Sequence, residues 1–354
     1  MLTRAKWATM GLRWHPESGS GGSNLRRWAV HGVRSLGFGQ GQDCTYVGAL
    51  AAALTAAGVE TTYQSLMGAT GCCYRIAFCH PHWDPSSVDG LIGYDFLAPT
   101  LDALPFEARF YDRVEGPERQ KAKEEVVRGL KAGRPSIGID LRVVAEWGVI
   151  AGYDEAKDAL LCRTYLDEGA EEYLPAERWP FLLMVLGEPR EPRDPRHLLL
   201  RSLRIAVDLP RFSGFRNYSS GLSAYKVWAF DLEDDERFED DVLQPVLWQC
   251  STNRFIYEGL LDARRAAAAY LRDSVPLLPG RAATALAHAA ACYQQLADML
   301  QEGLATVPCP ERDLADDVSR WIPEHRHTQA ALLRDCLHQE MAAIGTLAKV
   351  VEML

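Results

Sequence analysis

The feature that most constrains the fold is a change of pattern at residues 187–195, GEPREPRDP. Proline and charge interrupt regular structure there, so we place a domain boundary at this stretch. Before it, short β-type runs alternate with helices, and beyond it the pattern is helical throughout. A chain of 354 residues is longer than a single hydrophobic core usually accommodates, so we expect two domains, residues 28–190 and 191–354. Residues 1–27 contain the spacer SGSGGS and are predicted to form a flexible tail.

The first predicted domain combines helices with antiparallel strands. Residues 44–57 and 116–133 each place apolar side chains on one helical face and are expected to be helices. The intervals between the later strand-like runs are too short for helical crossovers, which favours an antiparallel sheet and the α+β class. A polar interval at 154–158 predicts a hairpin. The strand-like runs are 106–111, 136–141, 147–153, 159–165 and 181–186.

The second predicted domain has the pattern of an all-α, antiparallel helical bundle. Residues 281–304 and 324–353 carry apolar residues at spacings of three and four among strong helix formers. The Ala-rich stretch 260–273 is expected to be another amphipathic helix, and the acidic run 231–241 a solvated connector or helix start. Such a bundle would either cover the mouth of a cleft or mediate a homodimer.

Composition and charge exclude several classes of protein. The formal net charge of −10 is spread without long runs of like sign, so no broad basic face is expected for nucleic acid. No apolar run reaches membrane-spanning length, and the first residues lack the apolar core of a secretion signal. The nine cysteines are irregularly spaced and do not suggest a disulfide framework. We therefore expect a cytoplasmic protein with free thiols.

The segment GQGQDCTYVGAL, residues 39–50, places Cys44 where a glycine-rich approach becomes an apolar helix. A thiol at a helix N-terminus feels the positive end of the helix dipole, which stabilises the thiolate. Gln40 and Gln42 could supply a side-chain amide to an oxyanion. The adjacent Asp43 opposes thiolate formation unless it caps the helix. Two interpretations stay open: Cys44 is a nucleophile, or it is a small residue at the start of a buried helix.

Two stretches, GQDCTYVGAL and EWGVIAGYDEAKDALLCRTY, resemble the papain-like superfamily. The similarity is to its bacterial branch with the double-glycine leader peptidases and the N-terminal domain of butirosin biosynthesis protein H. The order helix, strand, helix, strand, hairpin supports the resemblance over residues 30–187. It implies a nucleophile helix packed on an antiparallel sheet, with Cys44 as the nucleophile and no cofactor or metal. It also implies amide or thioester chemistry on a small-molecule, peptide or carrier-bound acyl substrate.

Two positions depart from that family's pattern. The general-base His begins the strand that ends in a Gly-Tyr-Asp turn, and this chain has Glu146 there, followed by Trp147. The orienting Asp or Asn falls near Thr164 and Tyr165, so the triad His and Asp are missing from their expected positions. An ordinary carboxylate has too low a pKa to deprotonate a thiol efficiently near neutrality. The candidate catalytic residues are Cys44, Glu146 and Gln42.

The stretch GATGCCYRIAFCHPHWDPSS, residues 68–87, resembles a substrate-facing loop of the butirosin-H-like proteins. Arg75 and Trp83 are expected to hold an anionic, partly apolar ligand, the alternative being a surface arginine and a core tryptophan. Its cysteines and histidines are zinc-ligand types, but their spacing fits no zinc module and an extended chain would split them between two faces. The candidate ligand-binding residues are Gln40, Arg75, Trp83 and Trp147.

The sequence thus predicts a papain-like cysteine acyl-transfer enzyme, acyltransferase or peptidase-like, with a degenerate triad. The alternative is a non-catalytic papain-like module that binds a small ligand or a peptide. A histidine ring within hydrogen-bond reach of the Cys44 sulfur would favour the enzyme, and Glu146 there without a histidine would favour the binding module.

Overall fold

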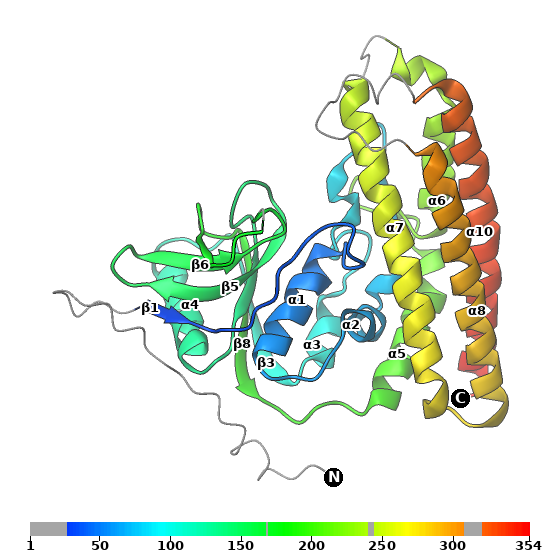
Figure 1. Ribbon diagram of the computed structural model, residues 1–354. Helices are drawn as coiled ribbons and strands as arrows, with labels where there is room; N and C mark the ends of the chain where they lie inside the picture. Colours follow the sequence, from blue (N-terminus) through cyan, green and yellow to red (C-terminus); the bar gives the residue numbers. More distant parts are fainter. Residues whose placement is uncertain (1–26, 168, 240–243, 308–320) are drawn as a thin grey trace. The chain divides into compact units, whose positions relative to one another are not determined.

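The computed structural model describes residues 27–167, 169–239, 244–307 and 321–354, whose course Figure 1 shows. The predicted tail, 1–27, lies outside these residues except for Arg27. Contacts group the chain into two compact units. Within the described ranges, unit 1 comprises 27–37, 49–60 and 106–189, and unit 2 comprises 38–48, 61–105 and 190–354. The division at 189–190 coincides with the predicted boundary, but residues 38–48 and 61–105 group with the helical region.

Unit 1 is built on an antiparallel sheet, which in the described residues has seven strands. The strand order is β3-β8-β4-β5-β6-β7, and β1 also pairs with β5. The predicted hairpin joins β5 to β6, with Asp154 opposite Ala159. The antiparallel sheet and the α+β class are therefore confirmed. The strands are β1 (Arg27–Ala29), β3 (Phe106–Asp112), β4 (Ser136–Ile139), β5 (Trp147–Asp154), β6 (Ala159–Arg163), β7 (Leu174–Pro175) and β8 (Leu182–Pro189).

Helix α4 (Gly116–Lys131) packs on this sheet, against β8 and its neighbours. Its Gly-Pro start suits the first turn, where a proline removes no helical hydrogen bond. The face formed by Ala122, Val126 and Leu130 is at most 2% exposed, as the apolar spacing predicted. Beyond the helix, Gly133 takes the left-handed backbone conformation at φ +74°, which ends it.

Helix α1 (Thr45–Ala56) is apolar on every side and is buried. Its apolar side chains from Tyr46 to Leu54 are at most 1% exposed, which is typical of a core helix. The helix begins one residue after the predicted start, and Gly58 at φ +83° follows its end. Residues 45–48 belong to unit 2 and the remainder to unit 1.

Unit 2 is mainly helical. The long helices α7 (Val246–Ser274), α8 (Gly280–Gly303) and α10 (Pro323–Glu352) pack side by side (Figure 1) and confirm the predicted helical C-terminal region. Helices α5 (Pro195–Asp208) and α6 (Leu222–Glu233) pack on α10, while α2 (Tyr63–Thr70) contacts both α7 and α3 (Leu97–Ala103). Among the described helices, none is both long and apolar enough to cross a membrane.

Short 3-10 turns join these elements: η2 (Cys72–Tyr74), η3 (Pro85–Val88), η4 (Leu209–Arg211), η5 (Asp235–Phe238), η6 (Val275–Leu277) and η7 (Leu304–Thr306).

Buried polar pairs align α7 with α10. Arg264 forms an ion pair with Glu340 at 2.7 Å, and eleven residues earlier in each helix Asn253 donates to Gln329 at 2.9 Å. Eleven residues make about three helical turns, so both pairs lie along one seam. The equal spacing requires α7 and α10 to run parallel, and any register shift would leave these polar groups without partners.

A small sheet in unit 2 corrects the sequence analysis. Strand β2 (Ala77–Cys79) pairs with β10 (Tyr218–Ser220), which pairs with β9 (Gly214–Phe215). The expectation that the chain is helical throughout beyond 195 is therefore wrong for β9 and β10. Strands of two or three residues are too short to show a period, and their stability comes from pairing with a distant segment.

Gly68 in α2 yields a stability prediction. A Cβ at this position would lie 1.9 Å from Cγ of Tyr270 on α7, so Gly68→Ala forces the two helices apart. Although alanine normally favours a helix over glycine, we expect the free energy of unfolding to fall by about 1–3 kcal/mol. The matched control is Gly345→Ala in α10, where a Cβ meets nothing within 4 Å and should add about 0.5–1 kcal/mol. Urea unfolding measures both, and equal stability of the two variants would contradict the packing described.

Candidate functional site

Cys44 is the residue immediately before helix α1. Its carbonyl accepts the Gly48 N–H at 2.9 Å, and its sulfur accepts the N–H of Val47 in the first turn. The sequence therefore placed Cys44 correctly at a helix N-terminus, where the dipole favours a thiolate.

The Cys44 thiol is nevertheless buried, with 7% of the residue exposed. Burial raises the pKa of the thiol well above its usual range, and the neighbouring Cys72 adds to the rise. The Arg75 guanidinium and the Val47 N–H act in the opposite direction but do not outweigh burial. In this conformation the thiol is protonated at neutral pH, in contrast to the exposed thiolate that a nucleophile requires.

A segment formed by residues 85–93, here called the cover segment, lies over the sulfur. An ideal Cβ built on Gly90 would stand 3.3 Å from the Cys44 sulfur and 2.8 Å from Cδ1 of Tyr46. The Gly90 backbone therefore touches both side chains, and glycine is the residue that allows this approach.

Strand β10 anchors the cover segment at both ends. Before it, Asp84 caps η3 by accepting the Ser86 N–H at 2.8 Å, and its other oxygen accepts the Tyr218 hydroxyl at 2.5 Å. At the far end, the Ser220 hydroxyl donates to the Gly93 carbonyl at 2.6 Å. The segment thus passes over Cys44 between two fixed points.

Arg75 is the cation beside the thiol, and its side chain is half-buried. Burial lowers the pKa of Arg75, while Cys44, Cys72 and Asp89 raise it. Its Nη1 donates to the carbonyls of Ser87 at 2.6 Å and Ile92 at 3.3 Å. In the described part of the chain, the side-chain hydrogen bonds of Arg75 all come from Nη1, so Nε and Nη2 keep their donors available.

Helix α7 supplies a carboxylate to the residues before α1. Asp262, 5% exposed, accepts the Tyr63 hydroxyl at 2.5 Å and the Asp43 N–H at 3.2 Å. The Cys44 N–H is donated to the Tyr63 oxygen at 3.1 Å. The backbone N–H of a nucleophile often stabilises an oxyanion, but here that N–H is engaged inside the protein. Sequence reasoning missed Asp262, since it lies 219 residues from Asp43 and fits the polar face of an amphipathic helix.

Asp43 and Asp262 are a buried pair of carboxyl groups. Burial raises the pKa of Asp43 to about 7; the charge of Asp262 also raises it, and the Gly39 N–H, 2.7 Å from Oδ1, lowers it. Burial also raises the pKa of Asp262, but hydrogen bonds from the Tyr63 hydroxyl and the Asp43 N–H oppose this rise. The hydrogen bonds to Asp262 favour its charged form, and burial keeps a proton on Asp43 up to about pH 7.

Arg264, two residues further along α7, holds the backbone that carries Arg75. It is fully buried, and its Nη1 donates to the carbonyls of Cys73 at 2.9 Å and Arg75 at 3.0 Å. Burial alone would lower the pKa of Arg264, but the Glu340 carboxylate holds it above its usual range. Helix α7 thus positions Cys44 through Asp262 and Arg75 through Arg264.

The other predicted site residues of unit 2 differ from one another in how far they are exposed. Gln40 is exposed and Gln42 half-buried on the approach to Cys44. Trp83 is 1% exposed and donates its indole N–H to Asp231 at 2.9 Å, so we treat it as a core residue rather than a ligand contact. Asp231 is itself 0% exposed, which corrects its assignment to a solvated acidic run.

Glu146 and Trp147 belong to unit 1, where Trp147 begins β5 and is fully buried.

Sequence reasoning missed a buried carboxylate near the position expected for the orienting Asp. Asp167, 8% exposed, accepts the Thr164 N–H at 3.0 Å and its hydroxyl at 2.6 Å, and pairs with Arg142 at 3.1 Å. The Thr-x-x-Asp spacing could have indicated this turn. Its partners make Asp167 a structural residue.

His80 and His197 pair with carboxylates and not with the Cys44 thiol. In the described residues no hydrogen bond links a histidine to Cys44; His80 pairs with Asp231 at 2.8 Å and His197 with Asp102 at 3.2 Å. Across the same ranges, no three His, Cys, Asp or Glu side chains gather in a group that could hold a metal ion.

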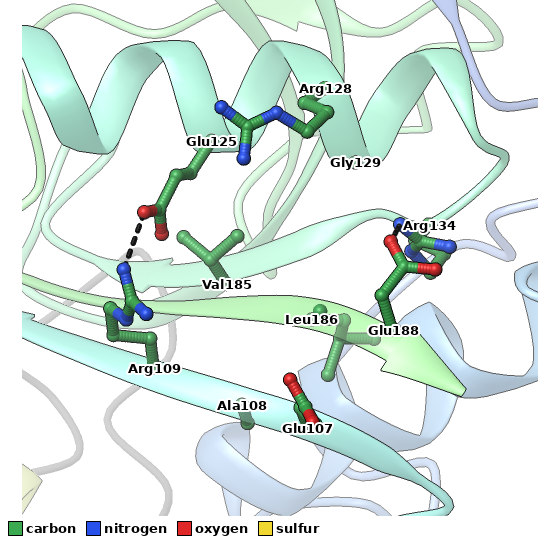
Figure 2. Close-up of a pocket in the computed structure, with 11 residues that line it drawn as sticks. Glu107, Ala108, Arg109, Glu125, Arg128, Gly129, Arg134, Val185, Leu186 and Glu188 are labelled. Carbon is green, nitrogen blue, oxygen red and sulfur yellow. Dashed lines mark hydrogen bonds and ion pairs between the residues drawn. The ribbon is translucent and has the colours of Figure 1, made fainter. Parts of the chain in front are cut away.

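Unit 1 has a separate hollow of about 190 Å³ between α4 and the strands β3 and β8, shown in Figure 2. Arg109 and Glu125 pair at 2.5 Å at one end, and Arg134 and Glu188 pair at 2.7 Å at the other. None of the predicted site residues lines it. These charges largely neutralise one another, so the Cys44 region remains the candidate site.

No family model matches the chain, and no curated protein matches it.

Asp43→Asn tests the buried carboxyl pair, because asparagine keeps an oxygen for the Gly39 N–H but cannot ionise. The pKa of Asp43 is near 4 in the unfolded chain and about 7 in the folded protein. Between these pH values the folded wild type binds more protons than the unfolded chain, so its stability falls as the pH rises. The Asp43→Asn variant does not lose stability in this way as the pH rises. We expect it to be more stable than wild type by about 2–4 kcal/mol at pH 8 and by far less at pH 4.

Urea unfolding at pH 4, 6 and 8 measures this difference, with the exposed Asp335→Asn in α10 as the control. A stability difference that does not change with pH would contradict the shared burial of the two carboxyls.

Proposed function

We propose that this protein is a papain-like cysteine acyl-transfer enzyme whose nucleophile is Cys44. One observation carries the proposal: the Cys44 sulfur lies at the N-terminus of α1, accepts the Val47 N–H and has Arg75 as its neighbouring cation. Each of these three features stabilises a thiolate. The α+β class and the core position of α1 support the papain-like assignment.

The proposed reaction moves an acyl group in two steps. The Cys44 sulfur attacks the carbonyl carbon of a thioester or amide, the bond to the leaving thiol or amine breaks, and the leaving group takes the thiol proton. An acceptor amine, thiol or water then attacks the acyl-enzyme and restores the free thiol. The available Nε donor of Arg75 stabilises the charge on the carbonyl oxygen. Gln42, in the same unit as Cys44, is retained from the sequence as the candidate amide donor.

The proposed substrates are small-molecule, peptide or carrier-bound acyl groups, and the proposed compartment is the cytoplasm. All eight cysteines of the described ranges are free thiols, which supports a reducing environment.

A second candidate function is a non-catalytic module that binds a ligand in the same region. Two observations favour it: Cys44 is 7% exposed, and burial raises the pKa of its thiol. In that case Arg75 would hold an anionic ligand and the thiol would serve only as a small packed group.

Intact-mass analysis after incubation with an acyl thioester of N-acetylcysteamine tests the enzyme. We expect the wild type to gain one acyl group, and Cys44→Ala to gain none, because the nucleophile is gone. Cys72→Ala is the matched control, since Cys72 is a buried neighbour of Cys44 and its loss should leave acylation in place.

Acylation of Cys44→Ala to the wild-type extent, or its absence from both wild type and Cys72→Ala, would reject the enzyme. Non-covalent binding of the donor to Cys44→Ala in native mass spectra, without an adduct on the wild type, would support the binding module.

A further inference from the structure

Arg75 connects the cover segment to the site beneath it. Its Nη1 donates to the carbonyls of Ser87 and Ile92, which lie on either side of Gly90, the residue in contact with the Cys44 sulfur. The guanidinium that neighbours the thiol therefore also holds the part of the cover segment around Gly90, while Val88, earlier in the segment, packs against Gly259 of α7.

The anchors of the segment do not depend on Arg75. Tyr218 and Ser220 hold its two ends through Asp84 and the Gly93 carbonyl. Release of the two Arg75 hydrogen bonds would loosen the segment around Gly90, while Val88 stays packed against α7 and both ends stay attached to β10. Such a change uncovers Cys44 without unfolding unit 2.

The hydrogen bonds that hold the segment are open to competition. A guanidinium binds a carboxylate through two parallel hydrogen bonds in which both partners are charged, whereas in its hydrogen bonds to the carbonyls of Ser87 and Ile92 only the donor is charged. Arg75 can begin such a contact with its available Nη2 donor and complete an end-on pair with Nη1, which displaces a carbonyl from Nη1. A neutral ligand has no comparable advantage over the carbonyls of Ser87 and Ile92.

We propose that the site selects acyl donors that carry a carboxylate near the reacting carbon, whose binding to Arg75 releases the cover segment from Cys44. The acyl-donor part rests on the proposed function. The release of the segment by a carboxylate does not, and it can be measured on the thiol alone.

Alkylation of Cys44 by iodoacetate and iodoacetamide separates a carboxylate probe from its neutral counterpart. Rates at Cys44, measured by peptide mapping and divided by the rates of the same reagents with glutathione, should favour iodoacetate by about fivefold to tenfold. Arg75→Met should abolish this preference, because the carboxylate then has no partner. Arg211→Met, which removes an exposed arginine of the turn η4, is the matched control and should leave the preference unchanged.

Hydrogen exchange gives a second measurement that does not depend on the thiol. Amides of residues 85–93 should exchange several-fold faster in Arg75→Met than in wild type, while the amides of β10 keep their protection. If Arg75→Met does not fold, Arg75→Lys replaces it in the test. Lysine keeps the charge but has no planar guanidinium for a bidentate contact, so this variant should show a reduced preference for iodoacetate.

A normalised rate ratio of one or less in the wild type would overturn the proposal. So would a cover segment that exchanges at the wild-type rate in folded Arg75→Met. Neither result bears on whether Cys44 accepts an acyl group from a thioester, so failure of this inference is distinct from failure of the enzyme.

Discussion

The candidate site depends on two buried charges of helix α7, Asp262 and Arg264. Moving a charge out of water costs several kcal/mol, so both must be paired or hydrogen-bonded to be tolerated. Asp262 obtains its hydrogen bonds from Tyr63 and the backbone before α1, and Arg264 obtains its partners from Glu340 and two carbonyls near Arg75. The same contacts that make burial of these charges possible hold Cys44 and Arg75 in place. Helix α7 is therefore part of the site within unit 2.

The reactivity of Cys44 is a balance between burial and local electrostatics. The helix N-terminus, the Val47 N–H and Arg75 favour the thiolate, whereas burial favours the thiol and prevails while Gly90 lies on the sulfur. Two components of this balance depend on the cover segment: burial, and the charge of its residue Asp89, which also raises the pKa of the thiol. Displacement of the segment would lower the pKa of the thiol through both, which couples access to the sulfur with its activation.

Local patterns in the sequence predicted the elements that carry the site, and long-range contacts decided the rest. The glycine-rich approach to an apolar run located the start of α1 within one residue, and the Gly-Pro start and Gly133 bracketed α4. No local signal could indicate Asp262, whose partners lie about two hundred residues away, or β10, which is stable only through pairing with β2. Trp83 illustrates the same limit, because its indole N–H is donated to Asp231 of α6, which is 148 residues away in the sequence.

The neighbour of the Cys44 thiol is an arginine, which limits the chemistry open to the proposed enzyme. An imidazole both removes and returns a proton, but a guanidinium stays charged and can only stabilise an anion. A departing amine must be protonated, which requires a group that gives up a proton near neutrality. A departing thiol can leave as the thiolate. In the proposed acyl transfer, Arg75 beside Cys44 therefore suits a leaving group that departs as an anion, which is the thiolate of a thioester.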